Sequence, residues 1–279
     1  RSTATTGQTL IWNGTDYSWG APASTVDISG KQDKNLLFAT SEFTDDNVSV
    51  NISTQVNSQG TTGAEGLTFS PDGTKMYVST QKPYVYQYTL STKNDVSSAS
   101  YANKSLHVQP PGGTAGANTP NPMAIRFSPD GTEFFIALEN DYWKIVRYTC
   151  STAFDISTAT YASDFLSIAP QFGNGSYGVG GMEISPDGTK IAIMNLNQMK
   201  IVQYDLSTAF DLSSGSYNNV EFSLNGKTSY PYGMAFNSDG TLMHVIGQTD
   251  QAIHSYILST AYDIATTVSY THLTLPTTD

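Results

Sequence analysis

The chain has 279 residues, of which 38% are hydrophobic and 11% aromatic, and this composition supports a folded globular protein. Its 24 acidic and 13 basic residues give a formal net charge of −11, and no basic run occurs, so the composition excludes a nucleic-acid partner. No apolar stretch of about eighteen residues occurs, which argues against a membrane-spanning helix in this sequence. The single cysteine, Cys150, excludes a disulfide framework within the chain and is expected to be a small buried hydrophobe.

Residues 1–30 are expected to form a separate hairpin and linker. Gly7-Gln-Thr-Leu-Ile-Trp-Asn-Gly-Thr-Asp-Tyr-Ser-Trp19 contains an apolar strand, an Asn-Gly turn and a returning aromatic strand. This stretch resembles the G-x-x-L-x-W-N-G-x-x-W element found between modules of phage tail fibres. The resemblance implies attachment to a fibre, with a homotrimer as the assembly. The alternative is an ordinary two-stranded cap on the domain that follows.

The sequence from residue 31 to residue 267 is dominated by a fourfold repeat. Each copy carries a Ser-Pro-Asp-Gly-Thr anchor, which reads Asn-Ser-Asp-Gly-Thr in the last copy. The anchor glycines, spaced by 58, 57 and 52 residues, are Gly73, Gly131, Gly188 and Gly240. A second anchor of the form Tyr-x-x-Ser-Thr starts at Tyr88, Tyr148, Tyr204 and Tyr256. A fixed period of this size indicates units that bury their faces against their neighbours.

Each copy contains four short segments of strand length. In the second copy they are rich in Val, Ile, Phe and Tyr and cover 105–108, 123–127, 133–138 and 144–148. Four antiparallel strands repeated at this period describe one blade of a β-propeller, so the sequence predicts an all-β fold. The expected units are about 48–101, 105–161, 165–217 and 220–266. These four blades are expected to be part of a larger ring of about six to eight.

Two patterns within the repeat predict structural roles. The aspartates of the Ser-Pro-Asp-Gly anchors are expected to shape type I turns rather than to bind ligands. A glycine or alanine occupies the same place before the anchor strand in every copy, and it is expected to lie near the crowded propeller axis. The four residues are Gly66, Ala124, Gly181 and Gly233. Two positions later, Arg126 in the second copy corresponds to Glu183 in the third, which predicts an ion pair between blades.

The repeats resemble those of prokaryotic and viral propellers with an F-S-P-D-G-T-K-x-Y-V blade signature. Phe69-Ser-Pro-Asp-Gly-Thr-Lys-Met-Tyr-Val78 matches that signature almost letter for letter, and 151–159 matches a narrower S-T-A-F-D-I-S-T-A form. The resemblance, to propellers of the YVTN and lactonase-like type, covers residues of about 48 to 266. It implies the fold and leaves the function open, because lactonases, lyases, scaffolds and adhesins share these blades.

Comparison of the copies separates constant connections from variable ones. The Ser-Pro-Asp-Gly turn and the Leu-Ser-Thr-Ala-Phe-Asp connection barely change, whereas the other two connections of each copy vary. In a four-stranded meander the variable connections emerge at one end, which predicts a binding face there. The side chains expected to contact a ligand are Tyr142, Trp143, Phe172, Tyr177, Tyr230, Tyr232, Asn197 and Gln248. Tyr142 and Trp143 are the leading pair, as adjacent aromatics in a turn expected to face solvent.

Exposed aromatic rings beside amides and carboxylates suit sugars, which stack through C–H faces and hydrogen-bond through hydroxyls. The sequence therefore predicts a non-enzymatic binding module without a cofactor: a receptor-binding or adhesion head, on a virion or cell surface, that contacts glycan or protein. One alternative is a lactonase-like or glycan-cleaving enzyme in which Glu139, Asp141 and Asp250 hold Ca²⁺. The other is a structural assembly domain that docks another subunit.

The last twelve residues depart from the repeat. Where a new outer strand is expected, Val268-Ser-Tyr-Thr-His-Leu-Thr-Leu-Pro-Thr277 appears, and it resembles the translation of a transposase-based sequencing adapter. Residues 268–279 are therefore expected to be a non-biological tail that packs poorly, on a fragment of a longer gene.

Overall fold

The computed structural model describes residues 63–108, 120–139, 143–172, 178–228, 230–247 and 252–268, together with the backbone of two N-terminal strands. The chain divides into two compact units, Arg1–Asn47 and Val48–Asp279. In the first unit, β1 (Thr9–Trp12) pairs antiparallel with β2 (Tyr17–Gly20), which confirms the predicted pair of strands. The relation of this hairpin to fibre proteins stays a prediction. No helix in the described ranges is long and apolar enough to cross a membrane.

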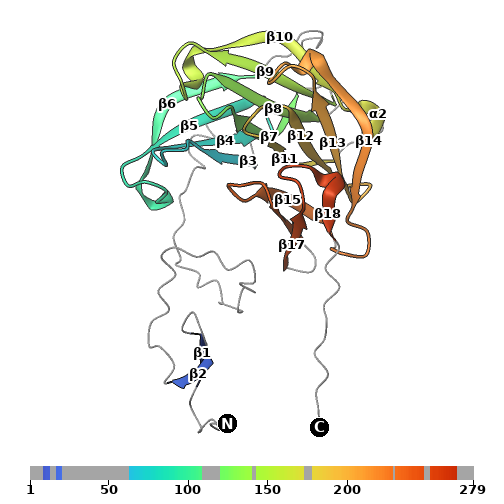
Figure 1. The fold of residues 1–279 in the computed structure, drawn as a ribbon. Coiled ribbons are helices and arrows are strands. Elements are labelled where there is room, and N and C mark those ends of the chain that lie inside the picture. The colour runs from blue at the N-terminus through green and yellow to red at the C-terminus, as the bar shows by residue number, and fades with distance from the viewer. Residues whose placement is uncertain are drawn as a thin grey trace. The chain divides into compact units, whose positions relative to one another are not determined.

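The second unit contains four four-stranded antiparallel sheets, each a meander of strands that follow one another in sequence (Figure 1). Each sheet is one blade of a β-propeller, which confirms the predicted fold. Blade 1 consists of β3 (Ala64–Phe69), β4 (Lys75–Thr80), β5 (Tyr84–Leu90) and β6 (Ala99–His107). Blade 2 consists of β7 (Asn121–Phe127), β8 (Glu133–Glu139), β9 (Lys144–Cys150) and β10 (Ala159–Ser167). Blade 3 consists of β11 (Val179–Ile184), β12 (Lys190–Asn195), β13 (Lys200–Leu206) and β14 (Gly215–Ser223). Blade 4 consists of β15 (Pro231–Phe236), β16 (Leu242–Gly247), β17 (Ala252–Leu258) and β18 (Thr267–Val268).

The outermost strand of each blade differs from its predicted place. The sequence pattern assigns 105–108 to the second unit, but the structure places 105–107 at the end of β6, where Ser105 lies opposite Tyr86 of β5. The reason is that the constant connection after β5 turns the chain straight back along its own blade. At the other end of the chain, Val268 pairs with Ile257 in β18, and 269–279 lie outside the described residues.

Each innermost strand leads into a tight turn that an aspartate shapes. In blade 1, Asp72 accepts hydrogen bonds from the Ser70 hydroxyl (2.6 Å) and the Thr74 N–H (3.0 Å), while Gly73 has a φ of 69°. These bonds lower the pKa of Asp72 to about 2, and the bond from the Ser70 hydroxyl has the largest effect. The aspartates that accept the equivalent threonine N–H in the other blades are Asp130, Asp187 and Asp239. The predicted turn-forming role of the four aspartates is confirmed.

The connection between the third and fourth strands packs onto this turn. In blade 2 it contains the 3-10 turn η2 (Ile156–Thr158), capped by Asp155, whose carboxylate accepts from the Ser157 N–H (3.1 Å). The Phe154 N–H donates to the Gly131 carbonyl (2.9 Å), and a Cβ on Gly131 would lie 2.3 Å from the Phe154 ring. The equivalent 3-10 turns are η1 (Val96–Ser98), η3 (Leu212–Ser214) and η4 (Ile264–Thr266). Since the bond to the turn glycine recurs in every blade, the two constant connections lie at one end.

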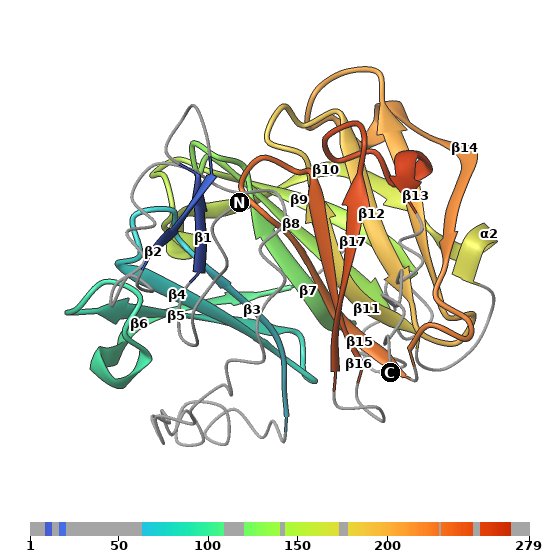
Figure 2. The ribbon, with the colours of Figure 1, turned by 60° about the horizontal axis from the view of Figure 1, so that its bottom comes forward.

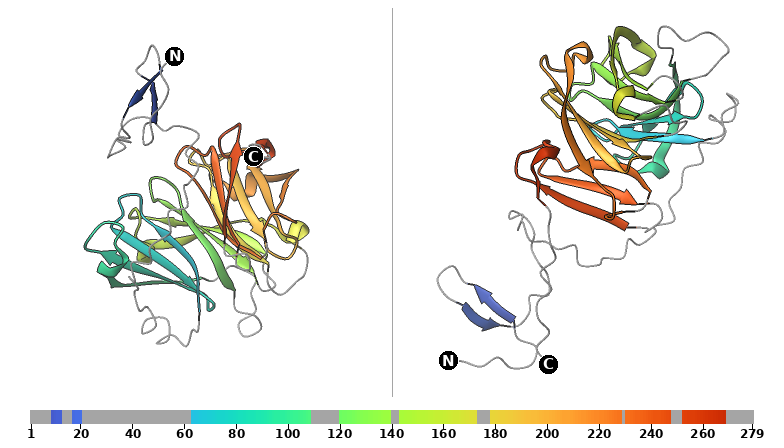
Figure 3. Two further views of the ribbon diagram at one scale, coloured as in Figure 1. Left: turned by 90° about the horizontal axis from the view of Figure 1, so that it is seen from below. Right: turned by 90° about the vertical axis from the view of Figure 1, so that its right-hand side faces the viewer.

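Among the described residues, three hydrophobic clusters lie between successive blades and a fourth lies within blade 1. β3 packs against β7, β7 against β11 and β11 against β15, so the innermost strands gather around a common axis (Figure 2). Figure 3 shows the blades following one another in chain order. At the first junction, Tyr77 and Val85 of blade 1 pack with Ile125 and Ile136 of blade 2. Cys150 is buried in the same cluster, as predicted. Similar clusters fill the other two junctions.

The small residues of the innermost strands are required by the close approach of the blades. A Cβ on Gly66 would lie 2.6 Å from the Met123 carbonyl oxygen, and one on Gly181 would lie 2.6 Å from the Met234 nitrogen. Both contacts are to the backbone of the next blade, which cannot move aside without separating the innermost strands. The predicted crowding at the axis is confirmed at these two glycines.

Candidate ligand-binding site

The variable connections of each blade meet at the end opposite the Ser-Pro-Asp-Gly turns. In each of blades 1 to 3, one backbone hydrogen bond joins the segment after the fourth strand to the connection between the second and third strands. The bonds run from Val108 N–H to Pro83 O (2.7 Å), Ile168 N–H to Trp143 O (2.9 Å) and Leu224 N–H to Met199 O (2.8 Å). We call this end the variable end, and the end that carries the Ser-Pro-Asp-Gly turns the turn end.

Two of the aromatic residues predicted to contact a ligand lie in the core. Trp143 is buried, and so is Phe172, which ends the four-residue helix α2 (Ala169–Phe172). Their rings are 6.0 Å apart and pack with Ile145 and Ile168 between blades 2 and 3. The expectation that Trp143 faces solvent is wrong, because its indole is buried in this core.

Two tyrosines at the start of β15 are exposed at the variable end. Tyr230 is 67% exposed and Tyr232 is 50% exposed. Tyr230 also has a φ of 52°, a left-handed conformation that few non-glycine residues adopt and that clusters at functional sites. Rings held in water keep their apolar faces available, so these two tyrosines are the predicted residues whose geometry suits ligand contact.

Tyr232 lines a hollow of about 190 Å³ on the propeller axis. Its lining also includes Glu65, Leu67, Met123 and Arg126, together with the backbone of Gly180. Glu65 is partly exposed, and no hydrogen bond or ion pair joins it to any residue that the structure describes. We call this feature the axial hollow. It offers an aromatic stacking surface together with a carboxylate that can accept hydrogen bonds.

Of the remaining predicted ligand contacts, the one that the structure describes, Asn197, does not line the axial hollow. Asn197 is exposed in the connection between β12 and β13. Its amide and the Trp143 indole both lie beside Gly178, where a Cβ would come 2.9 Å from Asn197 Nδ2. Asn197 therefore lies at the edge between blades 2 and 3. The predicted residues that lie outside the described ranges are Tyr142, Tyr177, Gln248, Asp141 and Asp250.

Glu139, a ligand in the alternative Ca²⁺ reading, is fully buried at the end of β8. Its Oε1 accepts from Asn121 Nδ2 (3.0 Å), and its Oε2 accepts from the N–H groups of Gly178 (3.0 Å) and Val179 (3.3 Å). Burial raises the pKa of this carboxyl, and the N–H donors oppose that rise. Both oxygens face N–H donors, so the side chain links blades 2 and 3. Within the described ranges, no group of three His, Cys, Asp or Glu residues could hold a metal ion.

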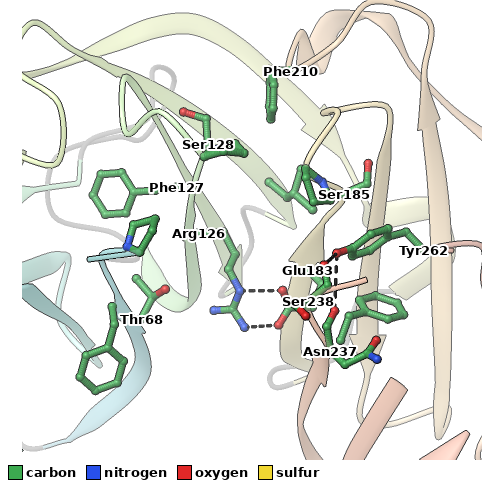
Figure 4. Close-up of a pocket in the computed structure, with 16 residues that line it drawn as sticks. Thr68, Arg126, Phe127, Ser128, Glu183, Ser185, Phe210, Asn237, Ser238 and Tyr262 are labelled. Carbon is green, nitrogen blue, oxygen red and sulfur yellow. Dashed lines mark hydrogen bonds and ion pairs between the residues drawn. The ribbon is translucent and has the colours of Figure 1, made fainter. Parts of the chain in front are cut away.

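A larger cavity of about 450 Å³ lies at the turn end (Figure 4). Residues from all four turns form its walls, with the rings of Phe127, Phe236 and Tyr262. Its charged residues are Arg126 and Glu183, whose guanidinium and carboxylate form a two-point pair: Nε to Oε2 is 3.0 Å and Nη2 to Oε1 is 2.5 Å. The predicted ion pair between blades is confirmed. The sequence signal for this cavity is the phenylalanine before the turn in three of the four copies.

The ion pair of this turn-end cavity and three of its hydroxyls are bonded within the protein. The third guanidinium nitrogen of Arg126, Nη1, donates to the Ile125 carbonyl (2.7 Å). The hydroxyls of Ser128 and Ser185 donate to their own turn aspartates, and the Tyr262 hydroxyl donates to the Ser238 carbonyl (3.0 Å). Although this cavity is the larger of the two, we assign it a structural role. The candidate ligand site is the axial hollow, because its carboxylate, Glu65, has no hydrogen bond or ion pair with the residues that the structure describes.

No family model matches the chain, and no curated protein matches its sequence. Among solved structures, it is similar to the periplasmic gluconolactonase PpgL of Pseudomonas aeruginosa, with 18% identity, a TM-score of 0.49, and coverage of 74% of this chain and 53% of that one. A Bacteroides uniformis protein assigned provisionally as a 6-phosphogluconolactonase has 13% identity and a TM-score of 0.48, covering 76% and 54%. A Lactobacillus plantarum protein has 17% identity and a TM-score of 0.48, covering 70% and 51%. The chain spans about half the length of each of these structures. The class of the protein, a β-propeller, rests on its own four blades.

Proposed function

We propose that this chain is a non-enzymatic binding module and that a glycan binds in its axial hollow at the variable end. The observation that supports the proposal is the exposed ring of Tyr232 in the same hollow as the Glu65 carboxylate, which has no hydrogen bond or ion pair within the described part of the chain. Sugars stack their C–H faces on aromatic rings and donate hydroxyl hydrogen bonds to carboxylates. The net charge of −11 favours a neutral or cationic ligand over an anionic one.

The carboxylates nearest the axis favour binding over bond cleavage. Glycoside hydrolysis generally requires a pair of carboxyl groups on either side of the scissile bond. Among the described residues that line the axial hollow, Glu65 supplies the one carboxylate. Glu183 forms an ion pair with Arg126, and Glu139 accepts hydrogen bonds from backbone N–H groups. A receptor-binding or adhesion role on a virion or cell surface extends this proposal, and its support is the N-terminal sequence resemblance.

The test is glycan-array binding by the full chain and by Tyr232→Ala and Glu65→Gln. Removing a stacking ring from a binding site costs on the order of 1–3 kcal/mol, so we expect affinity to fall about five- to one-hundred-fold for Tyr232→Ala. The matched control is Phe165→Ala, because Phe165 is also an exposed aromatic but lies on β10, the outermost strand of blade 2.

Two results would contradict the proposal. Equal affinity for the natural chain and Tyr232→Ala would remove the axial hollow as the site. Binding to protein receptors, with no glycan bound on the array, would show that the ligand class is wrong while the same variants still locate the site.

A further inference from the structure

The second and third strands of blade 4 present an apolar face to solvent, unlike the same face in the other blades. In blades 1 to 3 this face meets the next blade. The second residue of the third strand is Val85, Ile145 or Ile201, and each is fully buried. In blade 4 the same position is Ile253, which is 52% exposed.

A neighbouring position shows the same contrast. The fifth residue of the second strand is fully buried in blades 1 to 3, where it is Ser79, Ala137 or Met194. In blade 4 it is Ile246, which is 49% exposed and lies directly opposite Ile253. Paired isoleucines at these positions form a contiguous apolar patch, and exposed patches of this kind mark interaction surfaces.

The rest of this face is neutral. Ile257 extends the patch along β17 and is also exposed. His244 lies opposite Ser255, and its Nδ1 is 2.8 Å from the Ser255 hydroxyl oxygen. We call Ile246, Ile253, Ile257, His244 and Ser255 together the open face of blade 4. None of the five is an acid, a lysine or an arginine, so the face suits an apolar partner surface rather than a charged one.

The junctions within the chain show what covers such a face. At the first junction, Gln87 Oε1 accepts from the Ile156 N–H of η2 in the next blade (3.1 Å). At the third junction, Gln203 Oε1 accepts from the Ile264 N–H of η4 (2.9 Å). Each glutamine is the fourth residue of its third strand, and Ser255 holds that position in blade 4. The partner of this position is therefore the 3-10 turn of a following blade.

We propose that the open face of blade 4 docks a further blade of this same repeat, seated as blade 2 is seated on blade 1. The occupant brings an aliphatic sheet face onto Ile246 and Ile253 and places a 3-10 turn over Ser255. A second copy of the chain, paired through the same face about a two-fold axis, would place a sheet against Ser255. It would not supply the 3-10 turn that covers this position at the other junctions. Docking of a blade gives the predicted larger ring a specific joining surface.

The test is a variant, called the duplicated chain, in which a second copy of residues 215–266 is inserted directly after Thr266 and all other residues are kept. This segment supplies an outermost strand, a connection and the three inner strands of a blade that already packs on blade 3. The probe is Ile253→Asp in the first copy, measured in both the natural and the duplicated chain. A half-exposed site tolerates a charge in the natural chain, so its Tm changes by less than about 2 °C, whereas burial of that charge lowers the Tm of the duplicated chain by about 5 °C or more.

The matched control is Phe165→Asp, because Phe165 is exposed on an outermost strand. This substitution is expected to change the Tm of both chains equally. Equal Tm losses for Ile253→Asp in the two chains would overturn the proposal. Sedimentation of the natural chain as a dimer that Ile253→Asp dissociates would also overturn it, because the occupant would be a second copy. If the first duplication does not fold cooperatively, 159–214 inserted at the same place supplies blade 3 instead. Failure of both insertions to protect the amides of β16 and β17 from hydrogen exchange refutes the docking.

Discussion

Replacement of Glu139 by alanine tests whether this carboxylate holds blades 2 and 3 together. The substitution leaves three buried donors without an acceptor: Asn121 Nδ2 and the N–H groups of Gly178 and Val179. A buried donor without a partner costs about 1–3 kcal/mol. The loss is partly offset because alanine also removes a desolvated carboxyl, whose burial raises its pKa. We expect a net fall of about 2–4 kcal/mol in the free energy of unfolding.

Urea denaturation followed by tryptophan fluorescence measures this loss, since Trp143 lies beside Gly178. For a chain of this size the expected fall corresponds to a Tm lower by about 4–16 °C. Glu65→Ala is the control, because no hydrogen bond or ion pair joins Glu65 to the described residues and its removal is expected to change stability by at most about 0.5 kcal/mol. A Glu139→Ala loss no larger than that of Glu65→Ala would refute the reasoning. If Ca²⁺ stabilised the natural chain and not Glu139→Ala, the metal-ligand alternative would replace it.

Gly131→Ala is expected to lower stability more than Gly226→Ala. The two glycines have similar φ values of 73° and 72°, but only at Gly131 would a Cβ meet a ring, 2.3 Å from Phe154. Urea midpoints measure the difference, and equal losses would show that backbone strain alone accounts for the effect. The stability of the natural chain relative to Asp72→Asn is expected to shrink as the pH falls from about 4 to about 2. The folded pKa of Asp72, about 2, lies below the ordinary aspartate value of 3.8, so the carboxylate stabilises the fold above pH 3.8 and loses this contribution as the pH falls towards 2. A difference that does not change with pH would contradict the assigned hydrogen bonds.

The fold could be predicted from this sequence because the residues that form its turns recur at equivalent positions in all four copies of the repeat. Asp72 and its three equivalents occur in one turn signature, and the structure gives all four the same hydrogen bond to the following threonine N–H. Arg126 and Glu183 stand at equivalent positions of adjacent copies, so their pairing followed from blade order alone. Repetition lets one copy check the interpretation of another without any second sequence.

The candidate site could not be predicted in the same way, because variable connections have no equivalent to compare. The burial of Trp143 depends on its packing with the core between blades 2 and 3, and the other copies have no equivalent tryptophan that indicates this contact. The Glu139 contacts join a strand end to a backbone segment 39 residues further along the chain. Glu65 lies on the innermost strand β3 and not in a variable connection, so the variation between copies does not indicate it as a ligand contact.

The glycan site and the docking of a blade use different strands, which makes the two proposals separable. The axial hollow is built from innermost strands, through Tyr232 of β15 and Glu65 of β3. The open face is built from β16 and β17, through Ile246 and Ile253. Tyr232→Ala is therefore expected to weaken glycan binding equally in the natural and duplicated chains, while Ile253→Asp is expected to leave glycan affinity of the natural chain unchanged. A loss of glycan binding on Ile253→Asp would show that the two surfaces act as one site.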